Sequence, residues 1–133
     1  MALFESRYLQ ISLDEEKSII INKWLPTTKD MTDEEYQENM LEFVKLAEAH
    51  KPKFHLIESE EFLYGITVDM QEWTNNEIFP RLAAAGIKKI AFTVSSELVA
   101  QMSIEQALEE DKAAAFQVKY FDSKEDAVNW FFE

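Results

Sequence analysis

Hydroxyl and carboxylate side chains follow two apolar segments of this sequence, in positions where parallel strands would place a binding site. Glu58 and Ser59 end the first segment, and Ser95 and Ser96 follow the second. Ligands of open parallel sheets bind beyond the carboxyl ends of the strands, near the point where strand order reverses. We therefore expect these groups to meet at one edge of a sheet. Large apolar side chains from the segment between them would supply the wall of the site: Phe62, Tyr64, Met70 and Trp73.

Residue types that carry catalysis are scarce. There is no Cys, and the two histidines, His50 and His55, fall at a predicted helix end and inside a predicted strand. We interpret His50 as a capping cation and His55 as a hydrogen-bonded core imidazole. The only glycines, Gly65 and Gly86, are too far apart for a phosphate-binding loop. Because no nucleophile, base and oxyanion donor come together, we expect a protein that is not an enzyme and has no metal or cofactor.

The composition is that of one acidic domain over residues 1–133. The 13 Lys and Arg are scattered among 26 Asp and Glu, and the resulting net charge of −13 argues against binding nucleic acid or an anionic membrane. No apolar run approaches the roughly 18 residues of a membrane span. The first residues also lack the apolar core of a signal peptide. We expect a cytoplasmic protein of bacterial type.

The first part of the chain predicts a hairpin and a helix. Segments 8–13 and 18–24 flank the turn residues 14–16, which indicates two antiparallel strands. Thr32 and Glu35 have the spacing of a capping box, in which each side chain satisfies a free backbone N–H at the helix start. Five apolar residues behind this box repeat at helical spacing: Tyr36, Met40, Phe43, Val44 and Ala47.

Three further strands are predicted at 53–58, 88–94 and 115–121. Helical segments separate them, two short ones between residues 95 and 110, so we expect parallel pairing through right-handed crossovers. A last helix begins at Ser123. The element order is then ββαβαβαβα, an α/β fold covered by helices. Its mixed five-stranded sheet would consist of an N-terminal hairpin and three parallel central strands.

The second helix contains a proline. Asp69 and Glu72 are spaced as a capping box that would start this helix, and Gly86 would end it. Pro80 cannot donate a backbone hydrogen bond, so we expect a kink or a break there. The second half of the helix should face the sheet, whereas Met70 and Trp73 should point away from the buried stripe.

Several fragments carry a resemblance to a known family: Gln71-Glu72-Trp73, Pro80, Ala85-Gly86-Ile87-Lys88, Ile90-Ala91-Phe92, Tyr120-Phe121-Asp122 and Ala127-Val128-Asn129-Trp130. With the element order, they make the chain similar to STAS domains. This is the fold of bacterial anti-sigma-factor antagonists and of the cytoplasmic tails of sulfate transporters. The second half looks like a SpoIIAA-like group of small bacterial proteins of the STAS/CRAL-TRIO type. The resemblance covers most of the chain and implies this fold, but no settled biochemical activity.

The phosphorylation turn of that family departs from its pattern here. Anti-sigma-factor antagonists resemble one another in an Asp-Ser-Ser/Thr-Gly-type turn after the central strand, where a hydroxyl is phosphorylated. The matching place reads Glu58-Ser59-Glu60-Glu61-Phe62. A phosphate on Ser59 would therefore meet like charge. Thr67, just ahead of the second helix, would suit the helix dipole better. Ser59 and Thr67 are the two candidate phosphorylation sites.

Two functions remain open. The first is a non-enzymatic STAS-like interaction or regulatory module, whose apolar loop and second helix contact a protein partner or, in a homodimer, a second copy. The alternative is a carrier or sensor of a small apolar ligand, such as a lipid or fatty acid, held under Tyr64 and Trp73. A closed cavity lined by Phe62, Met70 and Trp73 would favour the alternative. If these aromatic residues only bury one another beneath the loop, neither function gains support.

Overall fold

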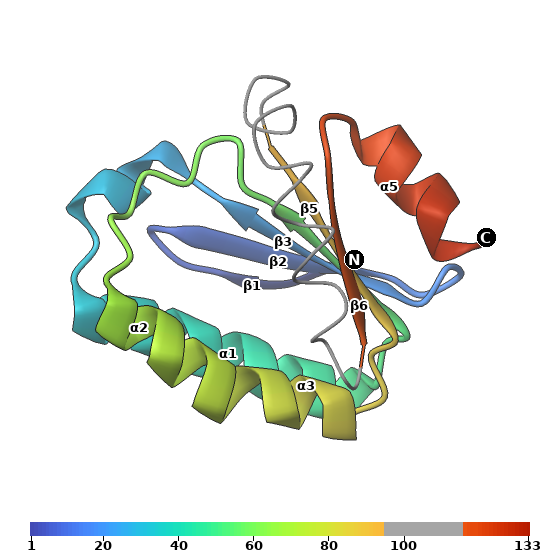
Figure 1. Ribbon diagram of the computed structural model, residues 1–133, viewed down its shortest axis with the longest axis horizontal. Helices are drawn as coiled ribbons and strands as arrows, with labels where there is room; N and C mark the ends of the chain where they lie inside the picture. The colour runs from blue at the N-terminus through green and yellow to red at the C-terminus, as the bar shows by residue number, and fades with distance from the viewer. Residues whose placement is uncertain (95–115) are drawn as a thin grey trace.

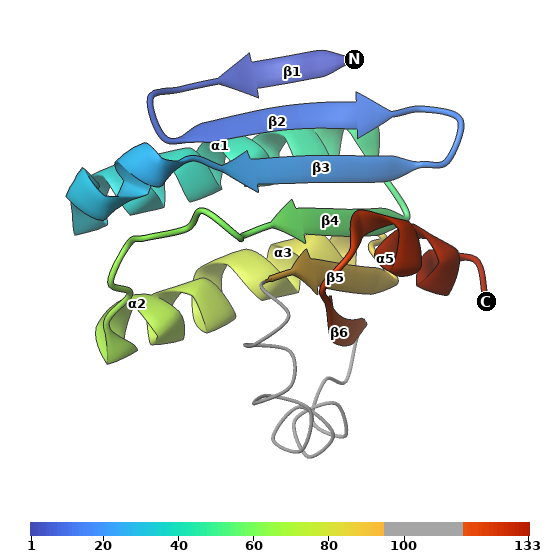
Figure 2. The same cartoon turned by 90° about the horizontal axis from the view of Figure 1, so that it is seen from above.

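The computed structural model of the protein describes residues 1–94 and 116–133, which form an α/β fold built on a mixed sheet (Figure 1). The sheet has six strands, and their order in space follows their order in the chain. The first three strands pair antiparallel, and the third to the sixth pair parallel (Figure 2). The strands are β1 (Ala2–Glu5), β2 (Leu9–Asp14), β3 (Ile19–Trp24), β4 (Phe54–Glu58), β5 (Lys89–Thr93) and β6 (Gln117–Phe121).

The expected count of five strands is wrong, because Ala2–Glu5 forms the additional edge strand β1. This strand is only 4 residues long, and its pairing with β2 shifts register between Ala2 and Phe4. Such an irregularity leaves no regular alternation of apolar and polar residues to mark a strand in the sequence. The β2–β3 hairpin and the parallel pairing of β4, β5 and β6 are confirmed.

The first helix, α1 (Asp33–His50), forms as its sequence predicts. Both bonds of the capping box are present: Glu35 N–H donates to Thr32 Oγ1 (3.2 Å), and Thr32 N–H donates to Glu35 Oε1 (3.0 Å). All five residues of the predicted apolar stripe are buried. The stripe therefore fixes which side of α1 lies on the sheet.

The second helical run differs from the prediction at its start and at its proline. Thr67, not Asp69, is the N-cap, since its Oγ1 accepts a hydrogen bond from the N–H of Met70 (3.2 Å). Pro80 lies in the first turn of the last segment, where a missing N–H costs no helical hydrogen bond. A π-helical turn rather than a break accommodates it. The segments are α2 (Val68–Trp73), η2 (Thr74–Ile78) and α3 (Phe79–Ala84).

Helices cover both faces of the sheet. The helix α1 and the run α2–η2–α3 lie on one face, whereas α5 (Lys124–Phe131) packs on β4, β5 and β6 from the other face (Figures 1 and 2). The larger apolar core lies between the sheet and the first layer of helices. The smaller core joins Trp130 and Phe131 of α5 to Phe54 and Leu56 of β4.

The C-terminal helix begins where the sequence predicts, because Ser123 Oγ accepts a hydrogen bond from the N–H of Asp126 (3.1 Å). Within the described ranges, no helix has the length and apolar character needed to cross a membrane. Ser95, Ser96 and the helices predicted between residues 95 and 110 lie outside those ranges.

Candidate functional site

The carboxyl ends of β3, β4 and β5 meet at one edge of the sheet, and the three arrows point left in Figure 2. Glu58, the last residue of β4, lies in register between Lys23 of β3 and Thr93 of β5. Ser59 begins the loop 59–67, which we call the edge loop. The N–H and the Oγ of Ser59 both donate to the carbonyl oxygen of Thr93 (3.0 Å each). The structure thus brings Glu58 and Ser59 to the expected edge. The expected reversal of strand order is not found among the described strands.

A small hollow opens at this edge and is called the edge hollow below. It has a volume of about 170 Å³ and is lined by Lys23, Trp24, Glu58, Glu60 and Glu61. Three carboxylates and one ammonium group give it a net negative charge. Thr93 Oγ1 of β5 donates a hydrogen bond to Glu60 Oε1 (2.7 Å) and so orients one of these carboxylates. In the described part of the chain, no group of three or more His, Cys, Asp or Glu is placed to hold a metal ion.

The aromatic side chains expected to form a wall pack against one another. Phe62 of the edge loop contacts Trp24 of β3, with ring centroids 4.9 Å apart. Tyr64 of the same loop stacks on Tyr36 of α1 at 5.0 Å, and Trp73 of α2 meets Tyr36 edge-on at 6.1 Å. Such contacts stabilise aromatic pairs beyond their buried area. They tie the loop, β3, α1 and α2 into one cluster.

Met70 and Trp73 lie at the margin of the main core, where both are partly buried. The expectation that both point away from the buried stripe is therefore wrong. Neither the edge hollow nor the second hollow described below is lined by Phe62, Met70 or Trp73. These three residues thus act as packing residues in this conformation. The aromatic residues bury one another beneath the loop, which is the arrangement that by itself supports neither function.

Hydrogen bonds hold the edge loop to the layer beneath it. Leu63 N–H donates to Thr28 Oγ1 (2.8 Å), and the buried Thr28 hydroxyl donates in turn to the carbonyl oxygen of Leu25 (2.7 Å). The phenol of Tyr64 donates to Asp33 Oδ1 in the first turn of α1. Burial, helped by the bond to Asp33, raises the pKa of Tyr64 above its ordinary value, so the phenol keeps its proton. The loop is therefore fixed against α1.

Two large apolar side chains at the edge loop and directly after it are exposed. Leu63 is 55% exposed, and Val68, the first residue of α2, is 69% exposed. Phe62, Ile66 and Met70 beside them in the chain are half-buried. We call these five residues the apolar patch. The spacing of these five residues along the chain does not show which are exposed and which are half-buried. Leu63 and Val68 were therefore not predicted as site residues.

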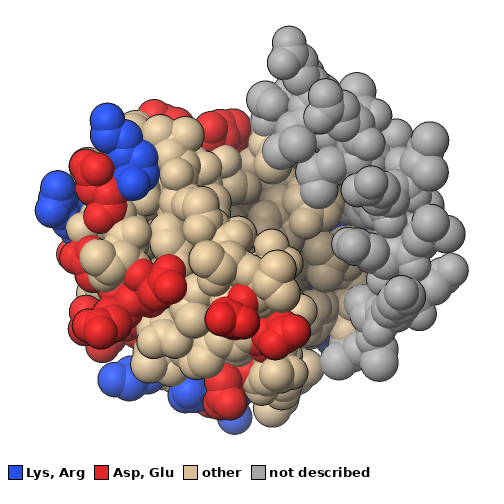
Figure 3. All heavy atoms as spheres, turned by 60° about the vertical axis from the view of Figure 1, so that its left-hand side comes forward, with Lys and Arg blue, Asp and Glu red and all other residues tan. Residues whose placement is uncertain are grey.

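Carboxylates surround the apolar patch. Asp33, Glu60, Glu61 and Asp69 are exposed, and they adjoin the patch in the chain or, for Asp33, through the bond to Tyr64. These four form the acidic rim. Figure 3 turns this edge of the molecule toward the viewer and shows Asp and Glu gathered around uncharged surface, with Lys and Arg nearer the margin. An apolar surface framed by charged and polar side chains is typical of an interface.

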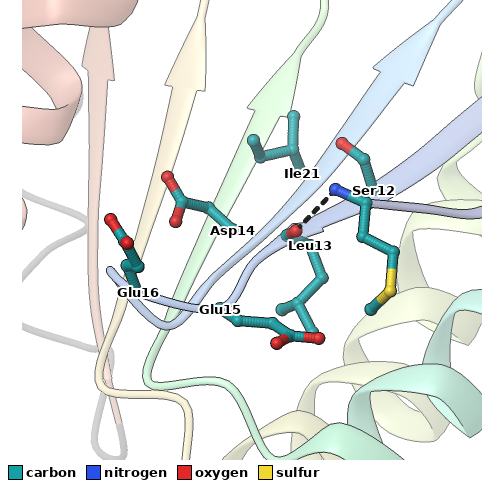
Figure 4. A pocket seen from close by; sticks show the side chains of 7 residues that line it. Ser12, Leu13, Asp14, Glu15, Glu16 and Ile21 are labelled. Carbon is teal, nitrogen blue, oxygen red and sulfur yellow. Dashed lines mark hydrogen bonds between the residues drawn. The ribbon is translucent and has the colours of Figure 1, made fainter.

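The second hollow lies at the opposite edge of the sheet, beside the turn between β2 and β3 (Figure 4). Its floor includes the backbone of β2, where the amino group of Met1 donates to the carbonyl oxygen of Leu13 (3.0 Å). None of the residues predicted for a site lies there. It has a volume of about 400 Å³ and is lined by Met1, Ser12, Leu13, Asp14, Glu15, Glu16 and Ile21.

The two candidate phosphorylation sites both use their hydroxyls in local structure. Ser59 is half-buried and donates to the carbonyl oxygen of Thr93, and phosphorylation would remove that donated proton. Thr67 is exposed and its Oγ1 caps α2 by accepting from Met70. A phosphate on Thr67 would keep acceptor oxygens at the start of α2.

Two buried polar residues lie in the main core, the predicted core histidine His55 and Asn22, which the sequence did not single out. His55 and Asn22 are each 1% exposed, and they lie on the same face of the neighbouring strands β4 and β3. Neither ring nitrogen of His55, nor Oδ1 of Asn22, has a hydrogen-bond partner among the described residues. The expectation of a hydrogen-bonded imidazole is therefore wrong. The ring stacks instead on Phe43 at 4.3 Å, and burial lowers its pKa to about 3.

Comparison of the chain with protein-family models, curated proteins and solved structures finds no match. The resemblance to STAS domains therefore rests on the sequence fragments and the coarse α/β arrangement. The carboxyl edge of the sheet brings together the edge loop, the apolar patch and the acidic rim.

Proposed function

We propose that the protein is a non-enzymatic, STAS-like interaction module that contacts a partner protein through the apolar patch. The observation that carries this proposal is the exposure of Leu63 and Val68, at 55% and 69%, within the acidic rim. Scattered single apolar residues are normal on a protein surface, but here two exposed ones lie within nine consecutive residues (62–70) that also hold three half-buried apolar side chains. Burial of such a patch against a partner would supply the apolar centre of an interface.

The rigidity of the edge loop supports this proposal. The stack of Tyr64 on Tyr36, the bond from Leu63 N–H to Thr28 and the Tyr64–Asp33 bond hold the loop before any partner arrives. A surface that is already ordered loses less conformational entropy on binding. The loop can therefore present the patch at little cost.

The alternative proposal, a carrier of a small apolar ligand, needs a cavity under Tyr64 and Trp73. Both side chains are engaged with Tyr36, and the two hollows are lined by other residues. Native mass spectrometry of freshly purified protein tests this alternative. Added mass that disappears on denaturation would support the carrier and would favour it over the interaction module.

Selection of peptides from a displayed library tests the interaction module. The double variant Leu63→Gln/Val68→Gln removes apolar surface from the patch without deleting a buried contact. Its control, Leu41→Gln, makes the same kind of change at a 36% exposed residue of α1. We expect peptides selected on the unmodified protein to lose affinity by about tenfold or more for the double variant, since two apolar side chains would no longer be buried against the peptide. Binding to the control should be unchanged. Peptides that bind all three proteins equally would contradict the proposal.

A further inference from the structure

The charges around the apolar patch define which kind of partner surface can bind there. The acidic rim places four carboxylates beside the exposed pair Leu63 and Val68. The edge hollow adds Glu58 and shares Glu60 and Glu61 with the rim. Exposed charges at the border of an interface select partners of opposite sign and speed their association.

We infer that the occupant of this surface is a basic protein segment, whose apolar side chains rest on the patch while a Lys or Arg side chain enters the edge hollow. This inference rests on the proposed function, because it assigns a partner class to the same surface. The hollow and the patch are close together, since Glu61 lines the hollow and Leu63 is only two residues further along the chain. Two residues span no more than about 7.6 Å between Cα atoms.

The lining of the edge hollow suits the end of a basic side chain, because its three carboxylates outnumber its one ammonium group, that of Lys23. Glu58, Glu60 and Glu61 offer carboxylate oxygens, which are the preferred acceptors for ammonium and guanidinium groups. Glu60 is already oriented, because Thr93 Oγ1 donates to its Oε1. The indole of Trp24 forms part of the wall, where it can contact the methylene groups of a Lys or Arg side chain.

The same charges disfavour a second copy of this chain as the occupant. Two copies joined through their patches would bring two acidic rims face to face, in a protein whose net charge is already −13. Like charges set against each other at an interface oppose association. The partner is therefore a different, basic protein rather than the homodimer considered from the sequence.

Three displayed peptide libraries with the same apolar positions test this inference. They differ only in the flanking positions, which are Lys and Arg in the first, Ser and Asn in the second, and Asp and Glu in the third. We expect the first library to yield the tightest binders that depend on Leu63 and Val68. Their affinity should fall as salt rises from about 0.05 M to about 0.5 M, because salt screens exposed charges.

Charge-removing variants complete the test. Glu60→Gln/Glu61→Gln keeps the size of both side chains and should weaken the basic peptides by about tenfold while reducing their salt dependence. The matched control is Glu15→Gln/Glu16→Gln, which removes the same charge from two exposed residues at the opposite edge. This control should bind as the unmodified protein does. Unchanged thermal unfolding would show that both variants are folded.

The outcomes separate the inference from the proposed function. Equal or tighter binding of neutral or acidic peptides through Leu63 and Val68 would overturn the basic partner and leave the interaction module standing. If no library yields binders that depend on Leu63 and Val68, both fail. Equal weakening by the two glutamine pairs would show that only net charge matters, which would overturn the role of the edge hollow.

Discussion

The phenol of Tyr64 donates a hydrogen bond to the carboxylate of Asp33, and this contact joins the edge loop to the first turn of α1. The two residues are 31 positions apart in the chain. Beside this bond, Leu63 N–H donates to Thr28, so the residue that exposes most of the loop's apolar surface is held from beneath. The conformation of the proposed interface therefore depends on contacts to α1 and η1 (Pro26–Asp30).

Tyr64→Phe should loosen the edge loop while leaving its aromatic stack in place. We expect the free energy of unfolding to fall by about 1 kcal/mol, the usual contribution of one hydrogen bond. The amide of Leu63 should also exchange with solvent faster, as measured by hydrogen exchange. Tyr8→Phe is the control, because it removes a phenol that bonds to Glu35 and does not contact the loop. Unchanged exchange at Leu63 in Tyr64→Phe would mean that the phenol does not hold the loop.

Burial of His55 should make the stability of the protein depend on pH. Its pKa is about 3 when folded and has the ordinary value of 6.5 when unfolded. Below pH 6.5 the unfolded chain takes up a proton that the folded protein does not. The contribution of neutral His55 to the free energy of unfolding is therefore complete above pH 6.5. This contribution is lost as the pH falls toward 3. We expect a loss of about 2 kcal/mol between pH 7 and pH 5, measured by urea unfolding.

His55→Leu should flatten that part of the pH profile, because leucine does not titrate. It should also cost little stability at pH 7, since it removes two ring nitrogens that lack partners among the described residues. His50→Gln is the matched control, because it removes the exposed histidine at the end of α1 and leaves the buried one in place. A profile in His55→Leu as steep as that of the unmodified protein would rule out this histidine as its cause.

The two glycines should respond in opposite directions to replacement by alanine. Gly86 has a φ of +102° and ends α3, where Ile87 N–H donates to the carbonyl oxygen of Leu82 (3.2 Å). Gly86→Ala should lower the free energy of unfolding by about 1–2 kcal/mol, because a Cβ is strained at positive φ. Gly65 has no such φ and nothing within 4 Å of an added Cβ, so Gly65→Ala should be neutral or stabilising by up to about 1 kcal/mol. Equal effects in chemical denaturation would contradict this distinction.

Trp73→Ala should act on stability rather than directly on binding. The indole packs edge-on against Tyr36 and is partly buried at the margin of the core. We expect its removal to lower the free energy of unfolding by about 2 kcal/mol, less than for a fully buried tryptophan. Val68→Ala is the comparison, because 69% of Val68 is exposed and its loss should change stability by no more than about 0.5 kcal/mol. If Trp73→Ala is as stable as Val68→Ala, the cluster does not hold the loop.

Part of the candidate site could be predicted from the sequence. Glu58 and Ser59 lie at the expected edge because the apolar run before them is a strand parallel to its neighbours. The sequence also pointed to Phe62, Tyr64 and Trp73, but not to the way in which they pack. Their choice between lining a pocket and contacting one another depends on Trp24 and Tyr36, which come from elements far away in the chain.

Features that depend on residues a few positions apart could be predicted from local spacing alone. The capping box of Thr32 and Glu35, the buried stripe of α1 and the end of α3 at Gly86 all follow from such local spacing, because a helix closes its hydrogen bonds within one turn. The exact start of α2 could not be predicted in this way, since Thr67 and Asp69 are both suitable caps. Which of them caps the helix depends on the path of the backbone.

Only the tertiary structure decided which side chains stay exposed and which buried polar groups lack partners. Leu63 and Val68 are as apolar as their buried neighbours, and their exposure depends on where the edge loop is held by Thr28 and Asp33. Likewise, His55 lies beneath α1 because strand register places it there, whatever its own polarity. Exposure and pairing are set by contacts between residues 30 or more positions apart, which no local pattern encodes.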